Sequence, residues 1–177
     1  MRPRTLFCAV FLATAAAFGH AEDFTQTITL VPDASIGGAF SAGWGVTHVE
    51  AGAFTDTFTF TPDVGGLVSA SVVSIGFTST TNLDFSAVTI NGSPFLLSPT
   101  GTFETGAFGL LPVGTPITMV VSGTAGPSLP VGSDLSASFA GTINISPVPE
   151  TETWALMFAG LAGIGVLMRR RLDQRGG

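Results

Sequence analysis

Lysine and tyrosine are absent from this chain of 177 residues, and arginine is confined to its ends. The six arginines stand at positions 2, 4, 169, 170, 171 and 175. Binding of DNA or RNA needs cations that face the phosphates, so the segment between Arg4 and Arg169 is excluded as a nucleic-acid interface. Schiff-base lysines, phosphate-binding lysines and arginine clamps are excluded there for the same reason.

Cysteine occurs once, as Cys8. It lies in the N-terminal segment, before most of the apolar stretch of that segment. That position does not suit a lipoprotein cysteine, which follows the apolar stretch. If the segment is removed, the rest of the chain has no thiol, which excludes disulfides, thiol catalysis and cysteine-based metal sites. Residues 22–153 then contain 11 acidic residues and no Lys or Arg, a net charge of −11. The length predicts a single domain, and the abundant apolar residues argue against disorder.

The first 21 residues have the order of a secretory signal peptide. Arg2 and Arg4 precede an apolar stretch over residues 6–18, and small residues follow at Gly19 and Ala21. This order predicts export and removal by a signal peptidase. Cleavage after Ala21 fits best, cleavage after Gly19 is the alternative, and an uncleaved anchor is a third reading.

The C-terminal region contains an uncharged apolar segment, residues 154–168, followed directly by Arg169, Arg170 and Arg171. A helix of this length spans about 22 Å, against about 30 Å for the hydrocarbon core of a bilayer. With Trp154 at one interface and the arginines reaching the other, we predict a single crossing of the inner membrane. The arginines favour a cytoplasmic tail over residues 173–177.

A short motif stands just ahead of this segment. The motif is Val148, Pro149 and Glu150, and the segment itself starts with Trp154, Ala155 and Leu156. In this order, motif, apolar helix and arginine cluster resemble the PEP-CTERM sorting signal of Gram-negative bacteria, although Thr151 replaces the usual second proline. The resemblance implies recognition by an exosortase, a membrane cysteine transpeptidase, and delivery to the cell surface or the extracellular polysaccharide matrix. An ordinary C-terminal anchor with a proline linker is the alternative.

The segment between the two ends alternates with period two rather than 3.6 and shows no convincing helical stripe. Strands are expected over residues 24–31, 54–61, 67–77, 85–90, 95–97, 102–111, 117–123 and 135–145. This spacing predicts an all-β fold, a single β-sandwich of about seven to eight antiparallel strands, with a barrel as the second choice. We therefore divide the chain into a signal peptide (1–21), a β-sandwich module (22–146), a sorting signal (147–172) and a tail (173–177).

Two local signals refine this picture. Asn91 and Gly92 between Ile90 and Ser93 predict a two-residue hairpin loop, and Pro94 places its return strand at a sheet edge. The Gly- and Ala-rich residues 32–45 are expected to form a long loop. Trp44 in this stretch either packs under the loop, which we prefer, or is exposed as a contact residue.

Asp56 is the most unusual acidic residue of the module. Period two places it on the same face as Phe54 and Phe58, and no Lys or Arg is present to pair with it. It therefore accepts backbone N–H bonds, turns to solvent at a bulge, or contacts a ligand or cation. Together with residues 83–92 and 141–146, the Phe54-x-Asp56-x-Phe58 element resembles the FxDxF family of PEP-CTERM proteins. The resemblance implies a secreted surface protein and brings no assigned activity.

Catalytic arrangements are weakly represented. His48 and Glu50 would allow a triad with one of many serines, but no Gly-x-Ser-x-Gly elbow accompanies them. Paired carboxylates for glycoside hydrolysis could come from positions 50, 56, 84 and 104, although most acidic proteins offer such pairs. Oxygen ligands for calcium are present, but no calcium-binding loop is recognisable. We predict no enzyme activity, no cofactor and no metal site. The expected function is a structural role in the matrix; a carbohydrate-binding module using Trp44 or exposed Phe is the alternative, and a polysaccharide hydrolase ranks below it.

Overall fold

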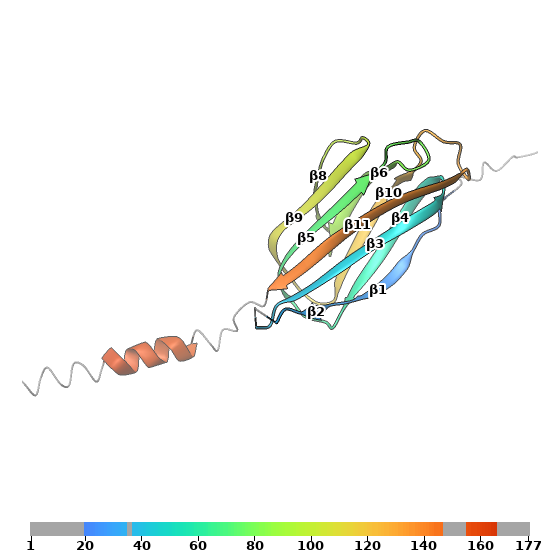
Figure 1. Ribbon diagram of the computed structural model, residues 1–177. Helices are drawn as coiled ribbons and strands as arrows, with labels where there is room; N and C mark the ends of the chain where they lie inside the picture. The colour runs from blue at the N-terminus through green and yellow to red at the C-terminus, as the bar shows by residue number, and fades with distance from the viewer. Residues whose placement is uncertain (1–19, 35–36, 147–154, 166–177) are drawn as a thin grey trace, which may run out of the picture.

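The computed structural model describes residues 20–34, 37–146 and 155–165 (Figure 1). Its strands are β1 (Thr25–Thr29), β2 (Val31–Pro32), β3 (Phe40–Glu50), β4 (Gly52–Thr61), β5 (Gly66–Ile75), β6 (Leu83–Ile90), β7 (Ser93–Pro94), β8 (Leu96–Leu97), β9 (Phe103–Val113), β10 (Ile117–Ala125) and β11 (Asp134–Ser146). The predicted all-β class is therefore confirmed. Most of the predicted sorting residues lie outside the described part, namely Val148, Pro149, Glu150, Trp154, Arg169, Arg170 and Arg171.

The strands form two sheets, which Figure 1 shows as two layers. One sheet has five strands in the order β1-β4-β10-β6-β7, and the other has six in the order β2-β3-β11-β5-β9-β8. The long strands pair antiparallel, but β1 runs parallel to β4, with Thr25 opposite Thr57. The expectation of purely antiparallel strands is wrong at this edge, because the first strand enters the sheet beside β4 instead of forming a hairpin with it.

The core lies between the two sheets and is built by the period-two alternation of their strands. On β4, Phe54, Phe58 and Phe60 point inward while the threonines between them remain outside. From the other sheet, β11 supplies Phe139 and Ile143 to the same cluster. The members of this cluster lie between residues 21 and 145, so the core includes Ala21, one residue ahead of the predicted start of the module.

The predicted loop over residues 32–45 is wrong in its second half, because β3 begins at Phe40. Trp44 packs inward, with its ring centroid 5.0 Å from that of Phe58. The space for the indole exists because Gly141 on the neighbouring strand has no side chain; a Cβ there would lie 2.5 Å from Trp44 Cζ2. Within the predicted loop, Gly45 also serves close packing within the sheet, because a Cβ there would lie 2.6 Å from the carbonyl oxygen of Phe139 on β11.

The predicted hairpin is confirmed, since Asn91 and Gly92 both have positive φ (47° and 80°) and Ile90 pairs with Ser93. Its return strand is shorter than expected. After β7 at the edge of the five-stranded sheet, the buried Phe95 carries the chain across to β8 in the six-stranded sheet. The prediction of one strand over residues 95–97 is corrected accordingly.

A helix occupies residues 155–165, which include Ala155 and Leu156 of the predicted sorting signal. The described part of the chain contains no helix of the length and hydropathy that crossing a membrane requires. Trp154 and residues 166–168 of the predicted crossing lie outside the described residues.

Candidate functional site

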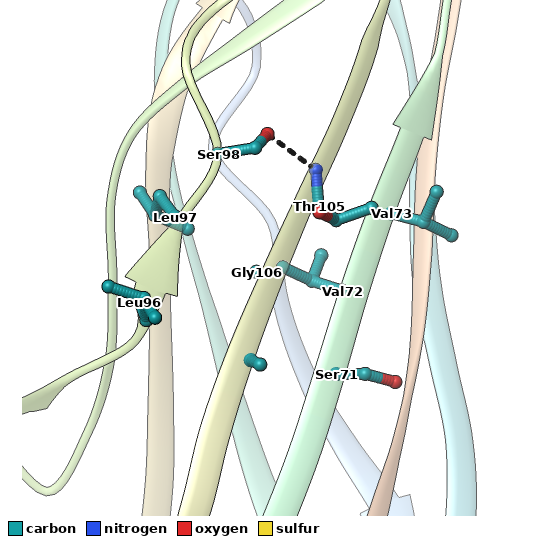
Figure 2. Close-up of a pocket in the computed structure, with 9 residues that line it drawn as sticks. Ser71, Val72, Val73, Leu96, Leu97, Ser98, Thr105 and Gly106 are labelled. Carbon is teal, nitrogen blue, oxygen red and sulfur yellow. Dashed lines mark hydrogen bonds between the residues drawn. The ribbon is translucent and has the colours of Figure 1, made fainter.

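The outer face of the six-stranded sheet has a groove along β9. Its volume is about 580 Å³, and its walls come from three neighbouring strands (Figure 2). The lining residues are Ser71, Val72, Val73, Leu96, Leu97, Ser98, Thr105, Gly106 and Ala107. Strand pairing positions them, because Ala107 lies opposite both Ser71 on β5 and Leu96 on β8.

Small side chains on β9 make the floor of the groove. A larger residue in place of Gly106 would force its neighbours to shift, since a Cβ there would come within 2.7 Å of Leu97 Cδ2 and 2.8 Å of Val72 Cγ1. On the outer side, Leu96 forms a wall with 82% of its surface exposed. The chain after β8 is held to β9 by Ser98, whose Oγ accepts the Thr105 N–H at 3.0 Å (Figure 2).

Exposed apolar side chains concentrate around this groove. Nine large hydrophobic residues of the described module are exposed, and six of them belong to β8, β9 or the C-terminal end of β5 and its continuation. These six are Ile75, Phe77, Leu96, Phe103, Leu110 and Leu111. We call the two aromatic residues Phe77 and Phe103, together with Ile75 beside them, the aromatic platform. Ile75 and Phe103 are register partners at one end of the groove, and Phe77 is 85% exposed. Such concentrations on a monomer are typical of interaction sites.

Asp56 lies in a different place, at the centre of the protein. Its Oδ2 accepts a hydrogen bond from His48 Nε2 at 3.1 Å, and its Oδ1 accepts the Phe24 N–H at 2.9 Å. Because His48 stands on β3 and Asp56 on β4, this pair links the two sheets and the start of β1. Both side chains are completely enclosed. No substrate can therefore reach them in this conformation.

Aromatic rings surround the His48 imidazole, with the Phe54 centroid at 4.2 Å and the Phe24 centroid at 5.5 Å. His48 Nδ1 has no hydrogen-bond partner among the described residues. Of the three alternatives for Asp56, acceptance of a backbone N–H is confirmed and exposure at a bulge is wrong. The imidazole partner of Asp56 was not predicted. Trp44, Val46 and His48 alternate inward along β3, a pattern that would have indicated this partner if a strand had been predicted there.

Glu104 forms a second link between the sheets. It stands on β9, is 1% exposed, and accepts the N–H groups of Phe85 on β6 (2.8 Å) and Gly101 (2.9 Å). Burial raises the pKa of Glu104 above its ordinary value of 4.5; the two backbone bonds oppose the rise, and the nearby Asp84 carboxyl adds to it. The negative charge of the Asp84 carboxylate disfavours a second negative charge on Glu104, so this neighbour favours the neutral form of Glu104.

Replacing Glu104 with glutamine is expected to change the pH dependence of stability. Because the folded-state pKa is raised, the native protein binds the proton more tightly, and stability falls as pH rises from about 4.5 through the folded pKa. The Glu104→Gln variant lacks this slope. Urea denaturation between pH 4 and pH 8 should therefore show the wild type gaining stability relative to the variant on acidification. A constant difference across this range would contradict the assignment.

The remaining residues considered for chemistry are separated. Trp44 is buried, which confirms the packed reading and excludes it as an exposed contact. Glu50 is exposed whereas His48 is enclosed, so these two residues do not form the catalytic triad with a serine that the sequence allowed. The structure brings Asp84 and Glu104 together, but the described residues contain no group of three His, Cys, Asp or Glu side chains suited to a metal ion.

Comparison with known proteins does not assign this chain to a family. No protein-family model matches the chain, and no curated protein matches it. One solved structure, that of Aeromonas hydrophila PliG, a periplasmic lysozyme inhibitor of g-type lysozyme, aligns with 71% of this chain and 100% of its own. The TM-score is 0.32 and the sequence identity 14%, values that do not establish a common fold.

Proposed function

We propose that this chain is a non-catalytic exported protein that an exosortase sorts to the cell surface or to the extracellular polysaccharide matrix of a Gram-negative bacterium. The single observation on which this rests is the order of three features in the C-terminal sequence. The Val148-Pro149-Glu150 motif precedes a charge-free segment, and an arginine cluster at residues 169–171 follows it. The proposed route has an inner-membrane intermediate, in which residues 154–168 hold the chain before processing.

The architecture of the module supports a non-catalytic role. Its two sheets enclose one core, and we propose that they form the expected β-sandwich. The carboxylates of Asp56 and Glu104, which a hydrolase would need at a surface, are enclosed and accept backbone N–H groups. A β-sandwich whose buried charges link its sheets suits a stable building block outside the cell, where no disulfide is available to this sequence.

The start of the module bears on signal-peptide removal. Ala21 is buried, and its N–H donates to the carbonyl of Ala53 at 2.9 Å, while His20 forms a β-bridge with the same residue. Cleavage after Ala21 would remove both contacts, and cleavage after Gly19 would retain them. We therefore propose that the signal peptidase cuts after Gly19, the second of the two positions that the sequence allows.

Deletion of the exosortase tests the sorting proposal. The protein should appear as a shorter product at the surface or in the medium of wild-type cells, and as a longer, membrane-bound form in the deletion strain. Combined Pro149→Ala and Glu150→Ala substitutions should reproduce the deletion phenotype, and Thr151→Pro, which restores the usual proline, should increase processing. Cell fractionation with intact mass measurement gives both readouts. Unchanged size and location in the two strains would refute the assignment.

A carbohydrate-binding function is a second candidate, and a specific observation favours it. The exposed aromatic side chains Phe77 and Phe103 stand beside a groove on an open sheet face. This location replaces Trp44, which the sequence offered for the same role and which is buried. A polysaccharide hydrolase has no comparable support.

A further inference from the structure

We propose that the β9 groove and the aromatic platform bind one segment of a neutral polysaccharide chain. This inference rests on the carbohydrate-binding candidate above and names its ligand class and its site. The groove residues and the platform lie on one strand line, because Phe103, Thr105 and Ala107 alternate outward along β9. At about 3.3 Å per residue, these positions extend over about 13 Å, enough for more than one sugar ring.

The chemistry of the surface fits the two kinds of atoms that a sugar ring presents. A pyranose has apolar C–H faces and hydroxyl groups around its edge. Phe77 and Phe103 offer apolar ring faces for the former, and Leu96 closes the side of the groove. For the latter, the Thr105 hydroxyl forms no hydrogen bond with any other described residue, so it can donate to and accept from a ligand.

Charge selects a neutral chain over an acidic one. None of the nine residues that line the groove is ionisable, and neither are the three residues of the aromatic platform. The surrounding module, residues 22–146, contains nine acidic residues and no Lys or Arg that could pair with a uronate, sulfate or phosphate. A polyanion would therefore be repelled on approach without gaining an ion pair on contact. A neutral polymer meets neither penalty.

A second copy of this chain is the other occupant that an apolar surface could accept. The geometry argues against edge-to-edge pairing through β9, because the strand contains Pro112 and its register with β5 shifts between Val68 and Ala70. Bulges and prolines at sheet edges hinder the addition of further strands.

The test measures binding of the full chain, purified in a mild detergent, to a neutral β-glucan, a neutral galactomannan and polygalacturonate. Isothermal titration calorimetry should detect binding to at least one neutral polymer and none to polygalacturonate. Phe77→Ala and Phe103→Ala should each weaken that binding at least tenfold. Val131→Ala is the matched control, because Val131 is 58% exposed, close to the 59% of Phe103, and stands outside the groove and the platform; it should bind as the wild type does.

The inference would be overturned by no binding to either neutral polymer, by preference for polygalacturonate, or by equal affinity of wild type and Phe103→Ala. Self-association that Leu96→Ser abolishes would assign the groove to a second copy and would equally refute it. Surface delivery of Phe103→Ala in cells separates this inference from the sorting proposal, since sorting does not involve the groove. Normal delivery without polysaccharide binding would mean that the ligand assignment alone has failed.

Discussion

Asp56→Ala is expected to lower the free energy of unfolding by about 3–5 kcal/mol, the cost typical of removing one partner of a buried pair. The substitution leaves His48 enclosed without its carboxylate and leaves the Phe24 N–H without an acceptor. Because these groups belong to β3 and to the start of β1, the loss falls on the junction of both sheets. Urea denaturation at pH 7, followed by tryptophan fluorescence, measures the change.

Two further variants make this expectation specific. Asp56→Asn retains an oxygen for the Phe24 N–H, but its amide group can donate to His48 Nε2 only if the imidazole proton moves to Nδ1, which has no acceptor in the described structure. Its loss should be about 1–3 kcal/mol, the cost of one unsatisfied buried group. Asp63 is exposed, and Asp63→Ala should change stability by less than about 0.5 kcal/mol. If Asp56→Ala were as mild as this control, the linking role would be disproved.

Phe139→Ala is expected to destabilise the module by a similar amount, about 3–5 kcal/mol. The Phe139 ring lies at the centre of an aromatic cluster and is 2% exposed. Five ring centroids stand between 5.7 and 6.2 Å from it, those of Trp44, His48, Phe54, Phe58 and Phe85. Removal of the ring leaves a cavity bounded by strands of both sheets, which cannot collapse without shifting several of them.

The matched control for this substitution is Phe103→Ala, because Phe103 has the same side chain but is largely exposed. Its effect on unfolding should stay within about 0.5 kcal/mol. Phe103→Ala should therefore lose polysaccharide binding but keep its stability. Phe139→Ala should lose stability. Equal losses of stability would show that the core does not centre on Phe139.

Several elements of the fold were predictable because their signals are local. The alternation of Phe and Thr over residues 54–61 specifies a strand with one buried face wherever it is placed. Asn91 and Gly92 specify a tight turn because both residues accept positive φ. By contrast, the glycines over residues 37–45 led to the wrong prediction of a loop, because glycine favours loops locally but also permits close packing of strands. The second role is seen at Gly45, which packs against Phe139 and Ala140 on β11, residues far away in the sequence.

The candidate site shows the same division. The sequence indicated that Asp56 faces the core without a cation, and its partner came from β3 in the opposite sheet. In the sequence, Glu104 was only one of four carboxylates considered for glycoside hydrolysis; the fold encloses it and pairs it with the Phe85 N–H. The groove could not have been predicted, because it depends on β8 crossing to the second sheet and standing beside β9.

By itself, the sequence determined the all-β class, the turn at Asn91 and the lack of cations throughout residues 22–153, since each depends on composition or on neighbours along the chain. The tertiary structure alone decided the parallel entry of β1, the His48–Asp56 pair, the burial of Trp44 and the position of the groove. The physical reason is that alternation tells which side chains of a strand face inward and which face outward. It does not tell which strands become neighbours, and every feature of the second group is a contact between neighbours.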